Sequence, residues 1–105
     1  MFNGCKSLKK LDLSNFNTNN LEEMNDMFSN CYSLTELNIS SFNTDNVKCM
    51  KMMFFDCSSL KELNINKSFI KERLITSKGN VFSGCPKIFR NKIQSIYPKI
   101  FVWPY

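Results

Sequence analysis

The chain has 105 residues, enough for one compact domain, and its 43% hydrophobic and 22% charged residues are typical of a folded protein. It contains no histidine, so the usual general base, the usual imidazole metal ligand and the Ser/His and Cys/His catalytic pairs are absent. The net charge of +5 is unevenly placed: residues 1–66 carry six Lys against eight Asp or Glu, and residues 67–105 carry eight Lys or Arg against one Glu. Composition therefore argues against an enzyme and places the basic character in the C-terminal part.

Two kinds of apolar segment are missing from the sequence. No stretch reaches the roughly 18 consecutive apolar residues of a membrane span. The first residues, MFNGCKSLKKLDL, lack the basic start and apolar core of a secretory signal peptide. By themselves these residues predict no transmembrane segment and a cytoplasmic chain.

The sequence repeats with a period of 26 residues. Such a period indicates stacked units, each of which buries its apolar side chains only against its neighbours. A fourth, incomplete copy follows a two-residue insertion, where Phe82, Cys85 and Ile88 recover the spacing. The columns that recur three times are Met1, Met27 and Met53; Phe2, Phe28 and Phe54; Cys5, Cys31 and Cys57; and Leu8, Leu34 and Leu60.

Each copy begins with a predicted strand. Apolar and polar residues alternate in LKKLDLS (residues 8–14), LTELNIS (34–40) and LKELNIN (60–66), as they do in a half-buried strand. Stacked units bring such strands side by side at about 4.8 Å. The repeat therefore predicts a short parallel sheet along one side of the molecule.

A short helix is predicted after each strand. Apolar residues recur every three or four positions from Leu21 to Phe28 and again from Val47 to Phe54, as on one face of a helix. Suitable N-caps precede both segments: Thr18 or Asn19, and Thr44 or Asp45. The expected fold is thus an α/β solenoid, a right-handed superhelix with the short helices on the side opposite the sheet.

The pattern L-x-x-L-x-L in all three copies resembles a leucine-rich repeat. The longer string MFxxCxSLxxLxxSxFNTxNxxxM is similar to the BspA-like class, a repeat family of surface proteins and lipoproteins in some bacteria, mycoplasmas and protist parasites. The resemblance covers residues 1–66, and residues 81–98 as a terminal half repeat. It implies a leucine-rich-repeat fold and recognition or adhesion at a cell surface. Because Met1 holds a regular repeat position with no capping segment before it, a piece of a longer array is expected.

Three parts are predicted along the chain. Residues 1–66 hold three BspA-like leucine-rich repeats, of which the third is incomplete and runs into residues 67–80. Residues 67–80 break the register and form an irregular connection. Residues 81–105 form the terminal half repeat, a capping helix and an aromatic tail.

The C-terminal part favours a cap, with two alternatives. An amphipathic helix is predicted from Ile88, Lys92, Ile93, Ile96 and Tyr97, and it would close the end of the stack. Basic residues mixed with aromatic ones also suit single-stranded nucleic acid or a membrane interface, although we expect these less. The mixed residues are Lys87, Arg90, Lys92 and Lys99 with Phe89, Tyr97, Phe101, Trp103 and Tyr105.

The cysteine and methionine columns are interpreted as core. Cys5, Cys31, Cys57 and Cys85 hold equivalent positions, so they are expected to be buried thiols, with disulfides or a zinc site between neighbouring copies as weaker alternatives. Cys49 lies outside this column and is expected at the surface as an idle or a reactive thiol. The repeated methionines predict core filling, and Met52 has no assignment. No cofactor and no metal are expected.

The candidate functional surface is the polar side of the strands. Residues between the buried leucines project outward and form a flat platform, on which we expect a protein or glycoconjugate partner to bind. The main prediction is a non-enzymatic interaction or adhesion module; the alternatives are an intracellular scaffold of the same fold, or nucleic-acid contact by the C-terminal tail. The predicted binding residues are Lys10, Glu36 and Glu62; Asp12, Asn38 and Asn64; and Ser14, Ser40 and Asn66.

Overall fold

The computed structural model describes residues 2–66, 68–70 and 81–97. Three short strands form one parallel sheet in the order β1 (Lys10–Asp12), β2 (Glu36–Asn38) and β3 (Glu62–Asn64). Each residue pairs with the one 26 positions later, as in Leu11 with Leu37 and Leu37 with Leu63. This is the register that the repeat predicts.

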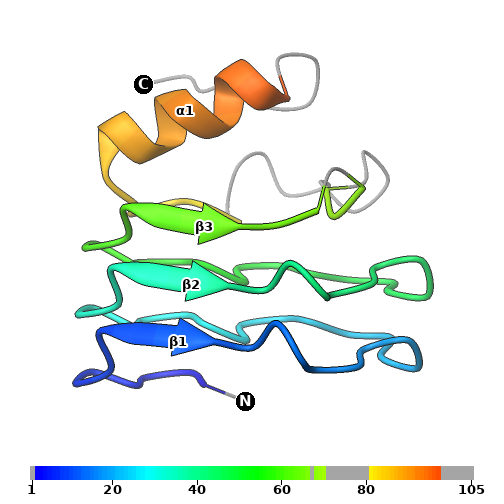
Figure 1. Cartoon of the computed structure of the whole chain (residues 1–105). Helices are drawn as coiled ribbons and strands as arrows, with labels where there is room; N and C mark the ends of the chain where they lie inside the picture. Colours follow the sequence, from blue (N-terminus) through cyan, green and yellow to red (C-terminus); the bar gives the residue numbers. More distant parts are fainter. Residues whose placement is uncertain (1, 67, 71–80, 98–105) are drawn as a thin grey trace.

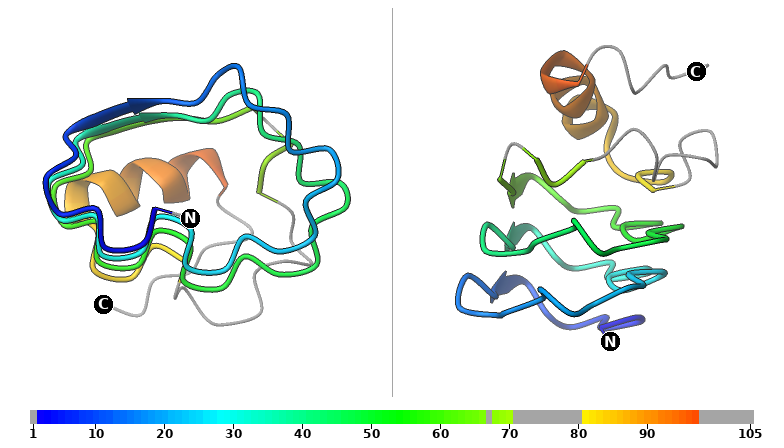
Figure 2. Two further views of the ribbon diagram at one scale, coloured as in Figure 1. Left: turned by 90° about the horizontal axis from the view of Figure 1, so that it is seen from below. Right: turned by 90° about the vertical axis from the view of Figure 1, so that its right-hand side faces the viewer.

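Three coils of chain lie one above another, and each contributes one strand to the sheet (Figure 1). We call residues 2–26 the first coil, residues 27–52 the second and residues 53–70 the third. Seen along the stack, the coils follow nearly the same outline, with the strands along one side (Figure 2). Repeated residues therefore meet their own equivalents in the next coil.

The prediction of short helices opposite the sheet is wrong. Residues 21–28 and 47–54 form turns and extended backbone, and Glu23 and Cys49 form an isolated parallel bridge. Backbone N–H groups here donate to the next coil: Met24 to the Cys49 carbonyl at 2.8 Å, and Phe28 to the Met53 carbonyl at 2.9 Å. A helix would use these groups within its own segment, so the inter-coil bonds replace it.

Turns at left-handed positions produce the spacing that resembled a helix. Asp26 and Met52 lie inside the two segments and have φ of 58° and 57°. A second repeated turn position, held by Gly4, Asn30, Asp56 and Gly84 in successive copies, also has positive φ, between 57° and 85°. Gly, Asn and Asp are the residues that tolerate this backbone best. Each tight turn returns the next apolar side chain to the interior after three or four residues, so the pattern predicts burial correctly and the element incorrectly.

The core is a set of side-chain ladders running through the coils. The rings of Phe2, Phe28, Phe54 and Phe82 stack almost parallel, with centroids 5.5, 5.7 and 5.1 Å apart. Further residues of the columns that the sequence assigned to the core are also buried, although Leu63 and Ile65 of the third coil are only partly so. The buried ones include Met24, Met27, Met50, Met53, Leu34 and Leu60. Stacking of equivalent residues therefore accounts for the repetition.

A helix, α1 (Lys87–Ile96), lies across the end of the stack beyond β3 (Figures 1 and 2). It buries Phe89 and Ile93, and the Phe89 ring tilts by 55° against Phe82 at 5.9 Å. The residues expected to face the stack are partly wrong, because Ile88 is 85% exposed and Ile96 is 58% exposed. By its spacing, Ile88 matches the column of Leu8, Leu34 and Leu60. The chain forms a helix after Pro86 instead of a fourth strand, so Ile88 does not join that buried column.

Several predicted features lie outside the described residues. They are the start of the methionine column at Met1, most of the connection at residues 67–80, and the aromatic tail with Lys99, Phe101, Trp103 and Tyr105.

Candidate functional site

Six of the nine predicted binding residues lie together on the outer side of the sheet. Lys10, Glu36 and Glu62 form one row across β1, β2 and β3, and Asp12, Asn38 and Asn64 form the next. With Leu11 and Leu37 beneath them, they line a shallow hollow of about 360 Å³. We call these six residues the strand face.

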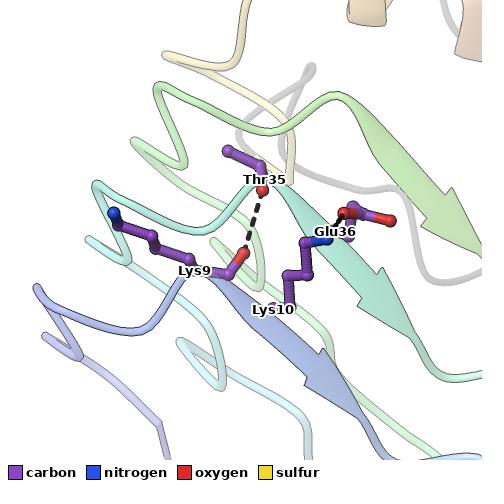
Figure 3. A network of polar contacts seen from close by, with 4 residues as sticks. All are labelled: Lys9, Lys10, Thr35 and Glu36. Atoms are coloured by element: carbon purple, nitrogen blue, oxygen red, sulfur yellow. Dashed lines mark hydrogen bonds and ion pairs between the residues drawn. The ribbon is translucent and has the colours of Figure 1, made fainter.

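The first row carries charge. The Lys10 Nζ lies 2.9 Å from Glu36 Oε2 (Figure 3). The hydrogen bond from Lys10 to Glu36, and then the Glu36 charge, raise the pKa of Lys10, and the Glu62 charge adds to this effect. Glu62 follows Glu36 in the row, so two carboxylates are neighbours, and Lys10 is the one ammonium group of these three residues. The strand face as a whole is acidic, with Lys10 against Asp12, Glu36 and Glu62.

Backbone at the start of β2 holds this row in place. The Lys9 carbonyl accepts hydrogen bonds from the Thr35 backbone N–H at 2.8 Å and from the Thr35 hydroxyl at 3.0 Å (Figure 3). Both donors come from the second coil and the acceptor from the first. The two adjoining residues, Lys10 and Glu36, are therefore fixed side by side where the strands begin.

The second row is fixed by local turns. The Ser14 backbone N–H donates to Asp12 Oδ1 at 2.9 Å, and the Ser40 N–H donates to Asn38 Oδ1 at 3.0 Å. Hydrogen bonds from the side chain and backbone of Ser14 lower the pKa of Asp12. These bonds hold the carboxylate and amide groups in one orientation, which reduces the entropy lost when a partner binds.

The third predicted column is not part of the hollow. The Asn66 Nδ2 donates to the carbonyls of Ser40 at 3.3 Å and Phe42 at 2.6 Å, and its Oδ1 accepts from the Ser68 N–H at 3.1 Å. Asn66 therefore connects the third coil to the second. Ser14 and Ser40 lie beyond the strand ends as backbone donors to the second row.

Buried threonines that follow the strands along the chain hold the coils together. The buried Thr18 hydroxyl donates to the Asn43 carbonyl at 3.1 Å and accepts from the Asn43 N–H at 2.8 Å, so Thr18 bonds the next coil and is no N-cap. Thr44 repeats the arrangement with the Phe69 carbonyl at 2.9 Å. Thr18 and Thr44 occupy equivalent positions in the repeat, which is the sequence signal that they share a structural role. The sequence does not show that the hydrogen-bond partner of each lies in the next coil.

The cysteine column forms a ladder of thiol hydrogen bonds. Each Sγ donates to a phenylalanine carbonyl one coil back: Cys31 to Phe2 at 3.1 Å, Cys57 to Phe28 at 3.0 Å, and Cys85 to Phe54 at 3.2 Å. All are free thiols. Burial raises the pKa of Cys57 to about 12 and raises that of Cys85 still further. The expectation of buried thiols is thus confirmed for these three residues.

The other two cysteines are half-buried: Cys5 at the open end of the column, and Cys49 in the bridge with Glu23. Within the described ranges, no group of three or more Cys, Asp or Glu side chains is placed to hold a metal ion. Nor does the described part of the chain contain a helix long and apolar enough to cross a membrane.

A second hollow, which sequence reasoning missed, lies between α1 and the third coil. It measures about 550 Å³ and includes the exposed Ile88. Its only sequence signal was the proline before the helix, which interrupts the repeat where a further strand would otherwise begin.

Comparison with known proteins gives one match. The family model described as "Mycoplasma protein of unknown function, DUF285" matches residues 1–96. No curated protein and no solved structure matches the chain.

Proposed function

The chain belongs to this family of mycoplasma proteins of unknown function, and we propose that it is a non-enzymatic module that binds a protein partner through the strand face. We further propose that its coils form a right-handed leucine-rich-repeat solenoid of the BspA-like kind. On this proposal the chain acts in recognition or adhesion at a cell surface. Its mechanism is complementarity of shape and charge with a preformed sheet.

The observation that carries the proposal is the fixed geometry of the six polar residues. Inter-coil hydrogen bonds hold the strands, and local bonds hold the side chains of Asp12 and Asn38. A surface that is ordered before binding loses less conformational entropy on binding. A shallow, open hollow suits a protein or glycan surface better than a small substrate, which usually occupies a deeper pocket.

The charge of the strand face indicates the partner's chemistry. Glu62 lies beside Glu36, whose carboxylate already binds Lys10, so Glu62 has no ion pair of its own among the described residues and the row carries more negative than positive charge. A Lys or Arg side chain of a partner would relieve the repulsion between the two glutamates. The proposed partner therefore presents a basic patch to β3.

Site-specific photo-crosslinking in the cells that produce the chain tests this function. A photoreactive amino acid at Asn38 lies in the strand face, whereas one at the exposed Lys51 lies outside it and serves as the matched control. We expect a discrete adduct from position 38 that is lost when Glu62→Lys is added, and none from position 51. Equal adducts from both positions, or an adduct that Glu62→Lys leaves intact, would contradict the proposal.

A further inference from the structure

The hollow between α1 and the third coil has a mixed lining that the core does not explain. Its apolar part comes from Leu60, Pro86, Ile88 and Phe89, its hydroxyls from Thr35, Ser58 and Ser59, and its cations from Lys61 and Lys92. None of these residues belongs to the strand face. The hollow is therefore a second surface with its own chemistry.

Ile88 is the most unusual of these residues. Ile88 is the second residue of α1 and is 85% exposed, whereas the next residue, Phe89, is buried. Leu60 and Phe89 also line the hollow, but they are 0% and 4% exposed, so the accessible apolar surface comes from Ile88 and the half-buried Pro86. An apolar group placed there would remove Ile88 from water, which favours binding.

The charged residues that the described part of the chain contributes to the lining of the hollow, Lys61 and Lys92, are both cationic. α1 carries Lys87, Arg90 and Lys92 and no acidic residue, and Lys61 contributes a further ammonium group from the third coil. Glu62 follows Lys61 directly, but its side chain lines the strand-face hollow. A negatively charged partner is therefore attracted to this end of the molecule, the opposite of the strand face.

We propose that this hollow is a docking site for an acidic peptide segment of a partner protein, with one large apolar side chain inserted against Ile88 and Pro86 and adjacent Asp or Glu side chains paired with Lys61 and Lys92. A single apolar anchor in a small hydrophobic hollow with a charged rim is the usual arrangement of such binding sites. A long acyl chain is a poorer fit, because lipid-binding sites enclose most of their ligand.

Panning of a phage-displayed library of random linear peptides on the immobilised full chain provides the probe. We expect the enriched peptides to combine an aromatic residue or Leu with neighbouring Asp or Glu. A fluorescent synthetic copy of one enriched peptide is then titrated with the chain in a polarisation assay. Its affinity should fall as salt rises, because the charged groups are solvent-exposed.

Matched variants locate the binding. Ile88→Ser should weaken binding by about tenfold or more, as removal of an anchor contact does. Ile96→Ser changes an exposed isoleucine of the same helix that does not line the hollow, and should leave the affinity unchanged. Lys61→Glu with Lys92→Glu should abolish binding, whereas Lys6→Glu with Lys51→Glu alters the net charge equally and should not.

Five results would overturn the proposal, four of them from the binding assays. They are a library that yields no peptide dependent on Ile88, enriched peptides that are basic or uncharged, equal losses in Ile88→Ser and Ile96→Ser, and displacement of the peptide by oleate or by anionic vesicles at lower concentration. Concentration-dependent self-association lost in Ile88→Ser, measured by sedimentation equilibrium, would assign the hollow to a second copy and also overturn it. Circular dichroism of each variant confirms that α1 is intact.

Discussion

The first and second coils carry equivalent apolar residues in the same register but bury them differently. Phe42 is 2% exposed, whereas its equivalent Phe16 is 43% exposed. Leu34 is fully buried and Leu8 only partly. Among the described residues the second coil has a neighbour on both sides and the first has one. Burial here is therefore a property of the stack, and a residue's position in the repeat alone does not determine its contribution to stability.

The largest effect is expected in the middle of this stack. Leu37 is 1% exposed in β2, between Leu11 and Leu63, so Leu37→Asp places a charge in the core and should cost about 4 kcal/mol or more. Asn38→Asp, one residue later and pointing outward, should change the free energy of unfolding by less than about 0.5 kcal/mol. Urea denaturation followed by circular dichroism measures both. Similar destabilisation by the two changes would show that the alternation along β2 is assigned incorrectly.

Substitutions of Phe42 and Phe16 test the comparison between the second and first coils directly. Phe42→Ala should lower the free energy of unfolding by about 3–5 kcal/mol, the usual loss for a buried aromatic side chain. Phe16→Ala should lower it by about 1 kcal/mol, because nearly half of its side chain is already in water. Denaturation midpoints of the two variants give the ratio of their losses in the free energy of unfolding. Equal losses would contradict the claim that neighbours on both sides determine burial.

Gly4 and Gly84 occupy the same turn position in the repeat. Alanine substitutions there separate the cost of backbone strain from the cost of a steric clash. Gly4 and Gly84 both have positive φ, but a Cβ added to Gly4 meets no atom within 4 Å, whereas one added to Gly84 meets the Asp56 carboxylate and lies 3.0 Å from its Cα. Gly4→Ala should therefore cost about 1 kcal/mol for the backbone alone, and Gly84→Ala about 2–3 kcal/mol. Thermal unfolding of both variants is the measurement. A smaller shift for Gly84→Ala than for Gly4→Ala would rule out the close approach of Asp56.

The last effect concerns the thiol ladder, which changes stability very little at neutral pH and acts only at high pH. Burial raises the pKa of Cys57 from 9.0 to about 12, so the unfolded chain loses this proton at lower pH than the folded chain. Stability should therefore be intact below pH 9 and fall between pH 9 and 12, by at most about 1.4 kcal/mol per pH unit from this thiol. Urea titrations across this range should show a steeper decline for the natural chain than for Cys57→Ala. Parallel declines would mean that the thiol is not buried when folded.

Much of this arrangement was predictable from spacing. Identical residues at intervals of 26 predicted the register of Leu11 with Leu37 and the stacked phenylalanines, because stacked repeats bring equivalent residues together. Alternation in the strands likewise predicted the outward side chains of Lys10 and Glu36. These features depend on the period alone, and the sequence shows the period directly.

Features that depend on backbone direction were not predictable in the same way. Apolar residues at intervals of three and four predicted a helix from Leu21 to Phe28, but left-handed turns produce the same spacing. Ile88 matched the leucine column, yet the chain enters α1 before reaching it. Asn66 resembled an outward residue, but its amide reaches the carbonyls of the coil before it. In each case the deciding contact lies in another coil or beyond the end of the repeat.

The most direct test of the stack is native-state hydrogen exchange of the full chain, resolved by residue. The strand amides of the second coil are bonded between two neighbouring coils, so they should exchange only on global unfolding, with Leu37 among the slowest. Amides of the first coil, including Phe2 and Leu13, should exchange faster through local opening. Uniform protection across both coils, or slower exchange in the first coil than in the second, would contradict the claim that neighbours on both sides stabilise each coil.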